Sequence, residues 1–231
     1  MTILTRENLG NGSYRTGLAM PEHLAWSEAQ VEESLAATWA LRPEGPVWVF
    51  AYGSLMWNPL IAIEEERTAT LQGWHRSFCL RSIAGRGRPE RPGRVLSLQP
   101  GGEVQGVALR LAESTALDEL RLLWTREMPS GAYLPRWNTV VLADGSAIQA
   151  VSFTADADHP LHDDDESAET VAQAVAFAAG AFGPNVDYVR SLEKALHDRG
   201  LSDPYVAAIV GALEKAMGTR AADAHRGASE P

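Results

Sequence analysis

The sequence predicts an α+β fold, in which a mixed, barrel-like β-sheet is flanked by helices. Short apolar runs separated by turn residues dominate from residue 47 to residue 153, as expected for strands. Beyond residue 167 the apolar residues recur at helical spacing, and one helical segment at 114–124 interrupts the strands. A length of 231 residues favours one substantial domain with smaller additions.

The first elements follow from turn and capping signals. Residues 1 to about 20 are polar and contain glycine, which predicts an irregular or extended arm. Ser27 is a candidate helix N-cap before an acidic first turn, and the helix that it starts should end before Pro43. Strands are expected at 47–52, 70–83, 94–98, 103–111 and 136–153, the last of which folds into a hairpin at Asp144-Gly145.

The last third of the chain changes to helices. The spacing predicts them at 167–181, 185–199 and 203–217, and after Gly218 the apolar periodicity is lost. The predicted organisation is therefore an N-terminal extension with one helix (1–45), a single domain (46–217) and a disordered tail (218–231).

Composition limits the partners and the compartment. Acidic residues outnumber basic ones by 30 to 20, and the net charge of −10 argues against a nucleic-acid partner, because phosphate binding needs a basic face. Cys79 is the one cysteine, which excludes an intrachain disulfide framework. The first 17 residues lack the apolar core of a secretion signal, and no apolar run approaches the roughly 20 residues that span a bilayer. We expect no membrane association and a cytoplasmic location.

Basic residues cluster in one segment that is rich in glycine and proline. Its arginines are Arg76, Arg81, Arg86, Arg88, Arg91 and Arg94. The segment is either a solvated loop that pairs with the acidic surface or a mobile lid that attracts an anionic substrate.

The apolar run at 47–57 breaks abruptly at Tyr52-Gly53-Ser54. This pattern predicts a buried strand that ends in a tight loop, and Gly53 permits a close backbone approach to a ligand. The alternative is a core strand followed by an ordinary turn.

Glu127 forms a charged pair with Arg126 directly after an apolar helix face. A Pro-Ser-Gly turn follows at 129–131, so the carboxylate can project from a helix end into a cleft. The alternative is a surface ion pair that contributes about 0 to 1 kcal/mol.

A metal site is considered at His159 and His162, which precede four acidic residues at 163–166. Pro160 lies between the two histidines and prevents a helical i, i+3 face, while the acids favour the start of the following helix. We therefore predict a solvated loop and no metal.

Together these segments resemble the ChaC-type gamma-glutamylcyclotransferases, the glutathione-degrading branch of the gamma-glutamylcyclotransferase superfamily. The matching residues, in chain order, are 48–57, Arg81, 92–95, 105–108, Arg126-Glu127, Tyr133 and 183–188. The similarity spans about residues 47 to 217.

The resemblance implies a gamma-glutamylcyclotransferase-like fold and an intramolecular reaction on glutathione that gives 5-oxoproline and Cys-Gly. It implies that Glu127 is the general acid/base and that no metal or cofactor is needed. The implied substrate-binding residues are Val49, Phe50, Ala51, Tyr52, Gly53, Ser54, Leu55 and Tyr188. For Tyr188 the alternative is a helix-face tyrosine packed against Leu192.

Two other functions stay open at this point. The turn at 128–132 departs from the Gly-Gly-Tyr turn of the family, as does Ala51 from a common glycine. The chain could therefore be a cyclotransferase for other gamma-glutamyl amino acids or amines, or a noncatalytic module that binds gamma-glutamyl groups.

Overall fold

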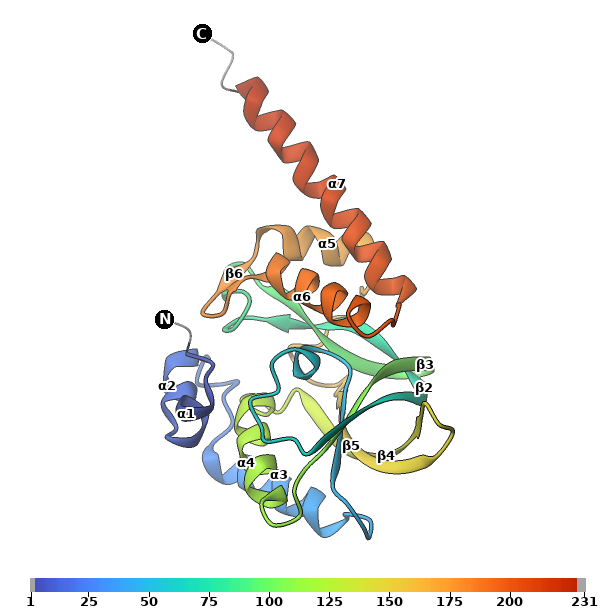
Figure 1. The fold of residues 1–231 in the computed structure, drawn as a ribbon. Coiled ribbons are helices and arrows are strands. Elements are labelled where there is room, and N and C mark those ends of the chain that lie inside the picture. The colour runs from blue at the N-terminus through green and yellow to red at the C-terminus, as the bar shows by residue number, and fades with distance from the viewer. Residues whose placement is uncertain (1–2, 228–231) are drawn as a thin grey trace.

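A computed structural model describes residues 3–227 and contains a closed β-barrel of mixed strand direction (Figure 1). Its strands are β1 (Trp48–Ala51), β2 (Glu65–Ser82), β3 (Gly93–Arg110), β4 (Tyr133–Leu142) and β5 (Ala147–Ala155). They are ordered β1-β3-β2-β4-β5, and the parallel pairing of Trp48 with Ala150 closes the barrel between β1 and β5. The predicted α+β fold with a mixed, barrel-like sheet is confirmed.

The hairpin of β2 and β3 is longer and more continuous than the sequence predicts. Expected strands at 94–98 and 103–111 are one strand, because Gly101 and Gly102 form an irregularity within it. Both glycines have positive φ angles, +110° and +70°, and the register shifts beside them between Gln72 and Trp74. Their turn signal thus marks a bulge and not the end of a strand.

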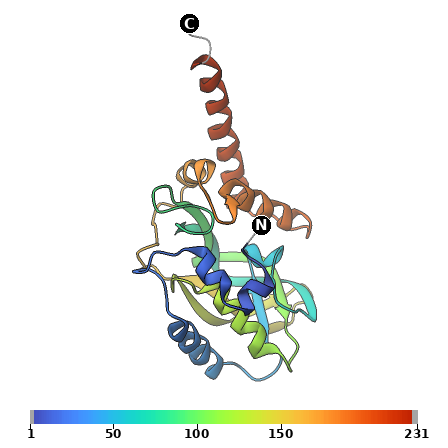
Figure 2. The ribbon, with the colours of Figure 1, turned by 90° about the vertical axis from the view of Figure 1, so that its left-hand side faces the viewer.

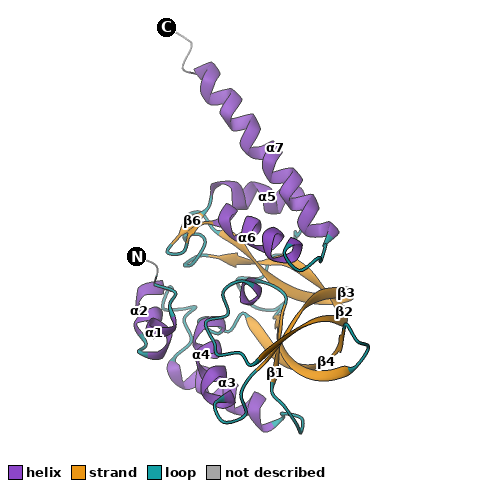
Figure 3. Ribbon diagram, viewed as in Figure 1, coloured by secondary structure: helices purple, strands orange, loops and turns teal. Residues whose placement is uncertain are grey.

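Helices cover the barrel on two sides (Figure 3). Alongside it lie α3 (Glu28–Ala40) and α4 (Ala116–Glu127), and at one end lie α5 (Ala168–Phe177), α6 (Asn185–His197) and α7 (Pro204–Gly227). The predicted cap is present, since Ser27 and Gln30 form a reciprocal capping box at the start of α3.

Helix α5 ends four residues before the predicted boundary at 181. Ala179–Gly180 (β6) instead pairs with Gly183–Pro184 (β7). A Cβ atom at Gly180 would lie 2.4 Å from the carbonyl oxygen of Gly87, so the glycine allows this backbone to pack against the arginine-rich segment.

The N-terminal extension holds three helices, and the prediction of one helix after an irregular arm is wrong. The first twenty residues contain α1 (Arg6–Gly10) and α2 (Ser13–Leu18). Thr5 caps α1 by accepting a hydrogen bond from the Asn8 amide, a local signal that is visible in the sequence. The helices are only five and six residues long, too short to be stable alone, so tertiary packing stabilises them.

The C-terminal boundary also differs from the prediction. Helix α7 runs to Gly227 and extends away from the barrel, whereas a disordered tail is expected from residue 218 (Figure 1). The alanines and arginines after Gly218 have high helix propensity and continue a helix without apolar periodicity. Residues 228–231 of the expected tail lie outside the described residues.

Within residues 3–227, none of the helices combines the length and the apolar character that crossing a bilayer requires.

Candidate active site

Two adjoining cavities lie beside the C-terminal end of α4. The inner cavity measures about 20 Å³ and the outer cavity about 170 Å³. The residues that line both are Ser54, Glu127, Tyr133 and Tyr188. A narrow compartment and a wide one, with polar side chains at their boundary, suit a substrate that has two unlike parts.

The loop after β1 forms one wall of the inner cavity and is held by an arginine. Arg76 is buried, and its Nε donates a 2.8 Å hydrogen bond to the carbonyl oxygen of Tyr52. It also donates to the carbonyl oxygen of Gln105 and forms a 2.8 Å ion pair with Asp203. The loop position is therefore fixed from the barrel side.

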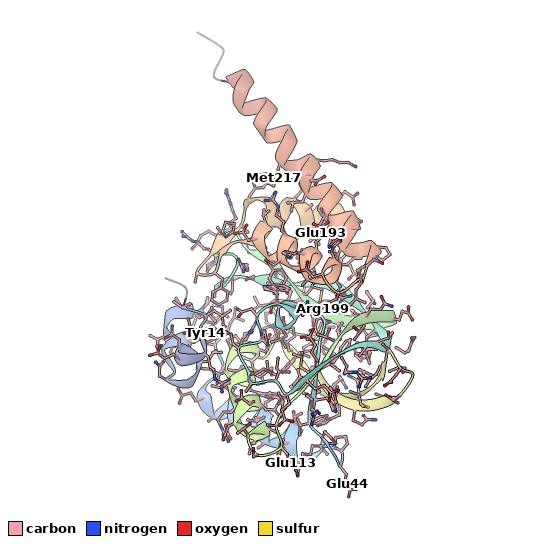
Figure 4. All side chains as sticks on the ribbon, viewed as in Figure 1. Tyr14, Glu44, Glu113, Glu193, Arg199 and Met217 are labelled. Carbon is pink, nitrogen blue, oxygen red and sulfur yellow. The ribbon has the colours of Figure 1, made fainter. Side chains whose placement is uncertain are left out.

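The short 3-10 helix η1 (Ser54–Met56) continues this loop. Arg199, labelled in Figure 4, donates a 2.7 Å hydrogen bond to the carbonyl oxygen of Met56. Because the start of a helix leaves backbone N–H groups without intrahelical acceptors, the amides of Ser54 and Leu55 are available to a ligand.

Gly53 is required for the close approach of Tyr188. A Cβ atom at Gly53 would lie 3.2 Å from the Tyr188 hydroxyl oxygen, which is tighter than ordinary packing. The two residues lie far apart in the sequence. Because Gly53 has no side chain, the Tyr188 hydroxyl can approach the loop after β1.

Glu127 is the last residue of α4, and its side chain is 15% exposed. Its Oε1 lies 2.9 Å from Nε of Arg126, but the geometry does not form a hydrogen bond, and Oε1 has no hydrogen-bond partner among the described residues. Burial raises the pKa of the Glu127 carboxyl, although the Arg126 guanidinium opposes this rise. A carboxylate with a raised pKa and an oxygen that accepts no hydrogen bond can accept a proton from a ligand.

Arg126 is buried too, so the two residues do not form a surface ion pair. Its Nη2 donates to the Ser54 hydroxyl oxygen at 2.8 Å, and its Nη1 donates to the carbonyl oxygens of Asn58 and Pro59. The guanidinium thus joins the end of α4 to the loop of β1 and η1.

Three tyrosines complete the inner cavity. Tyr52 donates a hydrogen bond to the carbonyl oxygen of Phe153, and Tyr133 donates one to that of Leu96 at 2.8 Å. Burial raises the pKa of Tyr52, Tyr133 and Tyr188, so all three phenols are neutral hydrogen-bond donors.

The structure brings together most of the residues that the sequence singles out. Tyr52, Gly53, Ser54 and Leu55 line the inner cavity, and Glu127 and Tyr188 line both cavities. Tyr188 also packs edge-on against Trp57, with ring centroids 5.4 Å apart, so it has a packing role as well.

Val49, Phe50 and Ala51 lie in β1 next to the pocket loop, and their part in substrate binding stays a prediction. They are fully buried in β1, which pairs with strands on both sides, and they line neither cavity. A strand in the middle of a barrel wall uses its backbone groups in the sheet, and the residues that line the inner cavity begin at Tyr52.

The arginine-rich segment is not simply a solvated loop, because some of its arginines are buried or line the outer cavity. Arg94 is buried and forms a 2.6 Å ion pair with Asp163. Arg86 lines the outer cavity, donates to the carbonyl oxygens of Phe182 and Pro184, and lies 6.0 Å from the Tyr188 ring centroid. It forms no ion pair among the described residues, which leaves its charge available to an anion.

Sequence reasoning missed Leu96 and Phe153 as pocket residues, and it named Tyr133 only as a family match and Arg86 only as one of six clustered arginines. Tyr133 lies within a matching segment of the family resemblance and could have been found there. Leu96 and Phe153 give no local signal, because an apolar strand residue looks the same whether it faces a pocket or the core.

The two histidines of the 159–166 segment differ in their partners. His162 lies 3.3 Å from Asp164 through Nδ1, and its buried Nε2 has no hydrogen-bond partner among the described residues. His159 contacts the carbonyl oxygen of Ser130 at 3.0 Å through Nε2 and accepts from the Leu161 amide at 3.1 Å through Nδ1. Over the part of the chain that the structure describes, no group of three or more histidine, cysteine or acidic side chains is placed to hold a metal ion.

Comparison with known proteins points to one family. A family model described as ChaC-like protein matches residues 47–216. The glutathione-specific gamma-glutamylcyclotransferase of Escherichia coli (strain K12) is 46% identical over 217 residues, which cover 93% of this chain and 94% of that protein. The glutathione-specific gamma-glutamylcyclotransferase 1 of Danio rerio is 30% identical and covers 72% and 88%.

A solved structure of a glutathione-specific gamma-glutamylcyclotransferase from yeast has the same fold. It superposes with a TM-score of 0.69 at 21% identity and covers 75% of this chain and 97% of the yeast chain. With the family model matching most of its length, the chain belongs to the ChaC-like family of gamma-glutamylcyclotransferases.

Proposed function

We propose that the protein is a glutathione-specific gamma-glutamylcyclotransferase that converts glutathione into 5-oxoproline and Cys-Gly. The observation that carries the proposal is the buried, unpartnered Oε1 of Glu127 at the boundary between the two cavities. The 46% identical relative from Escherichia coli, named as such an enzyme, supports the choice of substrate.

The glutamyl head lies where the two cavities meet, and the inner cavity, whose volume of about 20 Å³ has room for roughly one water molecule, receives only part of it. The neutral hydroxyl of Tyr188 and the amides of Ser54 and Leu55 supply donors for its carboxylate and for the gamma-carbonyl oxygen. Holding the head folded brings the α-amine to its own gamma-carbonyl carbon. Such orientation can supply about 7 to 11 kcal/mol of the barrier in well-oriented systems.

Glu127 then moves the proton. The α-amine of glutathione is mainly an ammonium at neutral pH, so Glu127 accepts its proton and frees the nitrogen lone pair. The nitrogen forms a bond to the gamma-carbon, and the carbonyl oxygen becomes an oxyanion. The protonated Glu127 gives the proton to the cysteinyl nitrogen as its bond to the gamma-carbon breaks and the oxyanion re-forms the carbonyl. The ring nitrogen then gives its second proton to the Glu127 carboxylate, which passes it to the departing Cys-Gly amine. The nucleophile belongs to the substrate, so the step needs no metal or cofactor.

The outer cavity takes the leaving Cys-Gly. Arg86 lines it with a charge that has no ion-pair partner among the described residues, and its guanidinium can bind the glycine carboxylate. This feature favours a leaving group with a carboxylate over a simple amine.

The site of action that we propose is the cytoplasm. The one cysteine, Cys79, is buried as a free thiol, and a chain without disulfides suits a reducing compartment.

The test is a product assay with the purified protein and reduced glutathione. We expect 5-oxoproline and Cys-Gly in equal amounts. A panel of gamma-glutamyl amino acids and amines in which glutathione is the poorest substrate would favour the broader cyclotransferase. Tight glutathione binding without either product would contradict the proposed activity and favour a binding module.

A further inference from the structure

The N-terminal arm, defined here as residues 3–26, forms a wall of the outer cavity. Leu4, Tyr14, Leu18 and Met20 line that cavity together with Glu127. In Figure 2 the helices of the arm lie in front of the barrel beside α4, and in Figure 4 the label of Tyr14 marks their position. The family model begins only at residue 47, so this wall comes from a segment outside the shared family core.

The arm is anchored to the first turn of α4, whereas Glu127, which lines the cavity, lies at the other end of that helix. Both Nη atoms of Arg6 donate 2.6 Å hydrogen bonds to the carboxylate of Glu119, which is buried and also accepts from the Ala62 amide at 2.8 Å. A bidentate pair of this kind fixes orientation as well as distance.

The arm also contacts the chain on both sides of Glu127. The Tyr14 hydroxyl donates to the carbonyl oxygen of Arg126 at 3.3 Å, and the Trp26 amide donates to that of Pro129 at 2.9 Å. The Tyr14 ring stacks on Phe182, with centroids 6.1 Å apart. The turn at 128–132, which departs from the family pattern, is therefore packed against the arm.

The side chains that the arm presents to the cavity are mainly apolar. Leu4, Leu18 and Met20 bring no charge, whereas Arg86 and Glu127 lie on other elements of the same cavity. An apolar wall of this kind sets how much volume is left for the group attached to the scissile nitrogen.

We infer that the N-terminal arm determines specificity for the leaving group, with Met20 limiting the size of the group on the cysteine side of the substrate. This inference rests on the proposed function, since the outer cavity is assigned to Cys-Gly. Met20 suits a test because its side chain lines the cavity and is only partly buried, so its replacement disturbs the core little.

The experiment compares kcat/KM for glutathione with that for S-butylglutathione, which adds four carbons to the leaving dipeptide. Met20→Ala should raise the ratio of S-butylglutathione to glutathione by about tenfold, and Met20→Trp should lower it by a similar factor, as expected for a few methylene groups in an apolar pocket. Leu9→Ala is the matched control, because Leu9 is buried in the arm but does not line the cavity. It should leave the ratio unchanged.

Opposite shifts in the two Met20 variants support the inference. Ratios that stay within about twofold of wild type, or that move in the same direction, overturn it. An equal shift in Leu9→Ala overturns the specific role of Met20, because loosening of the whole arm would then explain the effect.

A binding measurement separates this inference from the proposed function. The Kd values of both compounds are measured with the Met20 changes in a Glu127→Gln background. If wild-type protein forms no 5-oxoproline, the proposed activity is overturned. If the Kd ratio of the two compounds still shifts in opposite directions in the two Met20 variants, the role of the arm is retained. Unchanged Kd ratios would overturn the role of the arm.

Discussion

Glu127 is held in a position that serves chemistry at a cost in stability. Burial raises the pKa of its carboxyl in the folded state, and the charge of Arg126 only partly opposes this. For an acid with a raised folded-state pKa, the favourable contribution to folding is fully present below the unfolded pKa. It is lost as the pH rises through the folded pKa.

The first prediction concerns the stability of Glu127→Gln. The free energy of unfolding of this variant, minus that of wild type, should increase as the pH rises from about 4 to about 9. The increase should be about 1.4 kcal/mol for each unit by which folding raises the pKa of Glu127 in wild type. Urea unfolding of both proteins at several pH values measures the difference. A difference that is constant or shrinks with rising pH would show that the pKa of Glu127 is not raised.

The second prediction concerns Gly53, where a methyl group would displace the Tyr188 hydroxyl. Gly53→Ala should lower kcat/KM for glutathione by about 10- to 100-fold, because small displacements of positioning groups are costly. The assay is the product assay above. Gly211→Ala is the control, because a Cβ atom there meets nothing within 4 Å, and this variant should keep wild-type activity. Wild-type activity in Gly53→Ala would refute the close approach.

At the scale of elements, Arg76 connects the loop of the pocket to the start of α7. Asp203 pairs with Arg76 through Oδ2, and its Oδ1 accepts from the amides of Tyr205 and Val206. The Arg76 side chain is 1% exposed, so its charge depends on this partner.

The third prediction is that Asp203→Asn lowers the free energy of unfolding by about 3 to 5 kcal/mol, because it leaves a buried guanidinium without a countercharge. Asparagine can still cap the helix, so the loss reports on the ion pair. Asp198→Asn is the control, because it removes an exposed acid that pairs with Lys194, and it should change stability little. Equal effects of the two substitutions in urea unfolding would contradict the prediction.

The fourth prediction concerns the joint between the arm and the turn after α4. Gly131 has a φ of +72°, and a Cβ atom there would lie 2.0 Å from the Trp26 ring. Gly131→Ala should release the arm and expose residues 3–26 to limited proteolysis. Gly145→Ala is matched in backbone strain, with a φ of +84°, but meets no neighbour. Cleavage of the arm at equal rates in the two variants would rule out the contact with Trp26.

Local sequence signals predicted the elements well where capping residues or turn residues determine where a helix begins or a hairpin turns. The capping box at Ser27 and the hairpin at Asp144-Gly145 are present as expected. The arm escaped prediction because its short helices depend on distant contacts, such as that of Arg6 with Glu119.

For the whole molecule, the central feature is a pocket assembled from the loop after β1, the end of α4, helix α6 and the N-terminal arm. The family resemblance singled out Gly53, Glu127 and Tyr188, which share the inner cavity. It also included Val49, Phe50 and Ala51, which pair with β3 and line neither cavity. Residues such as Arg86 and Tyr14 could not be placed from the sequence, because their contacts span about a hundred residues along the chain.

The most direct test of the central claim is the kcat of Glu127→Gln for release of 5-oxoproline from glutathione, measured together with its Kd for glutathione. The account predicts a kcat that is about 10²- to 10⁴-fold below wild type, because the proton acceptor is lost. It predicts a Kd close to that of wild type, because the donors around the glutamyl head remain. A Glu127→Gln enzyme with wild-type kcat would contradict the account.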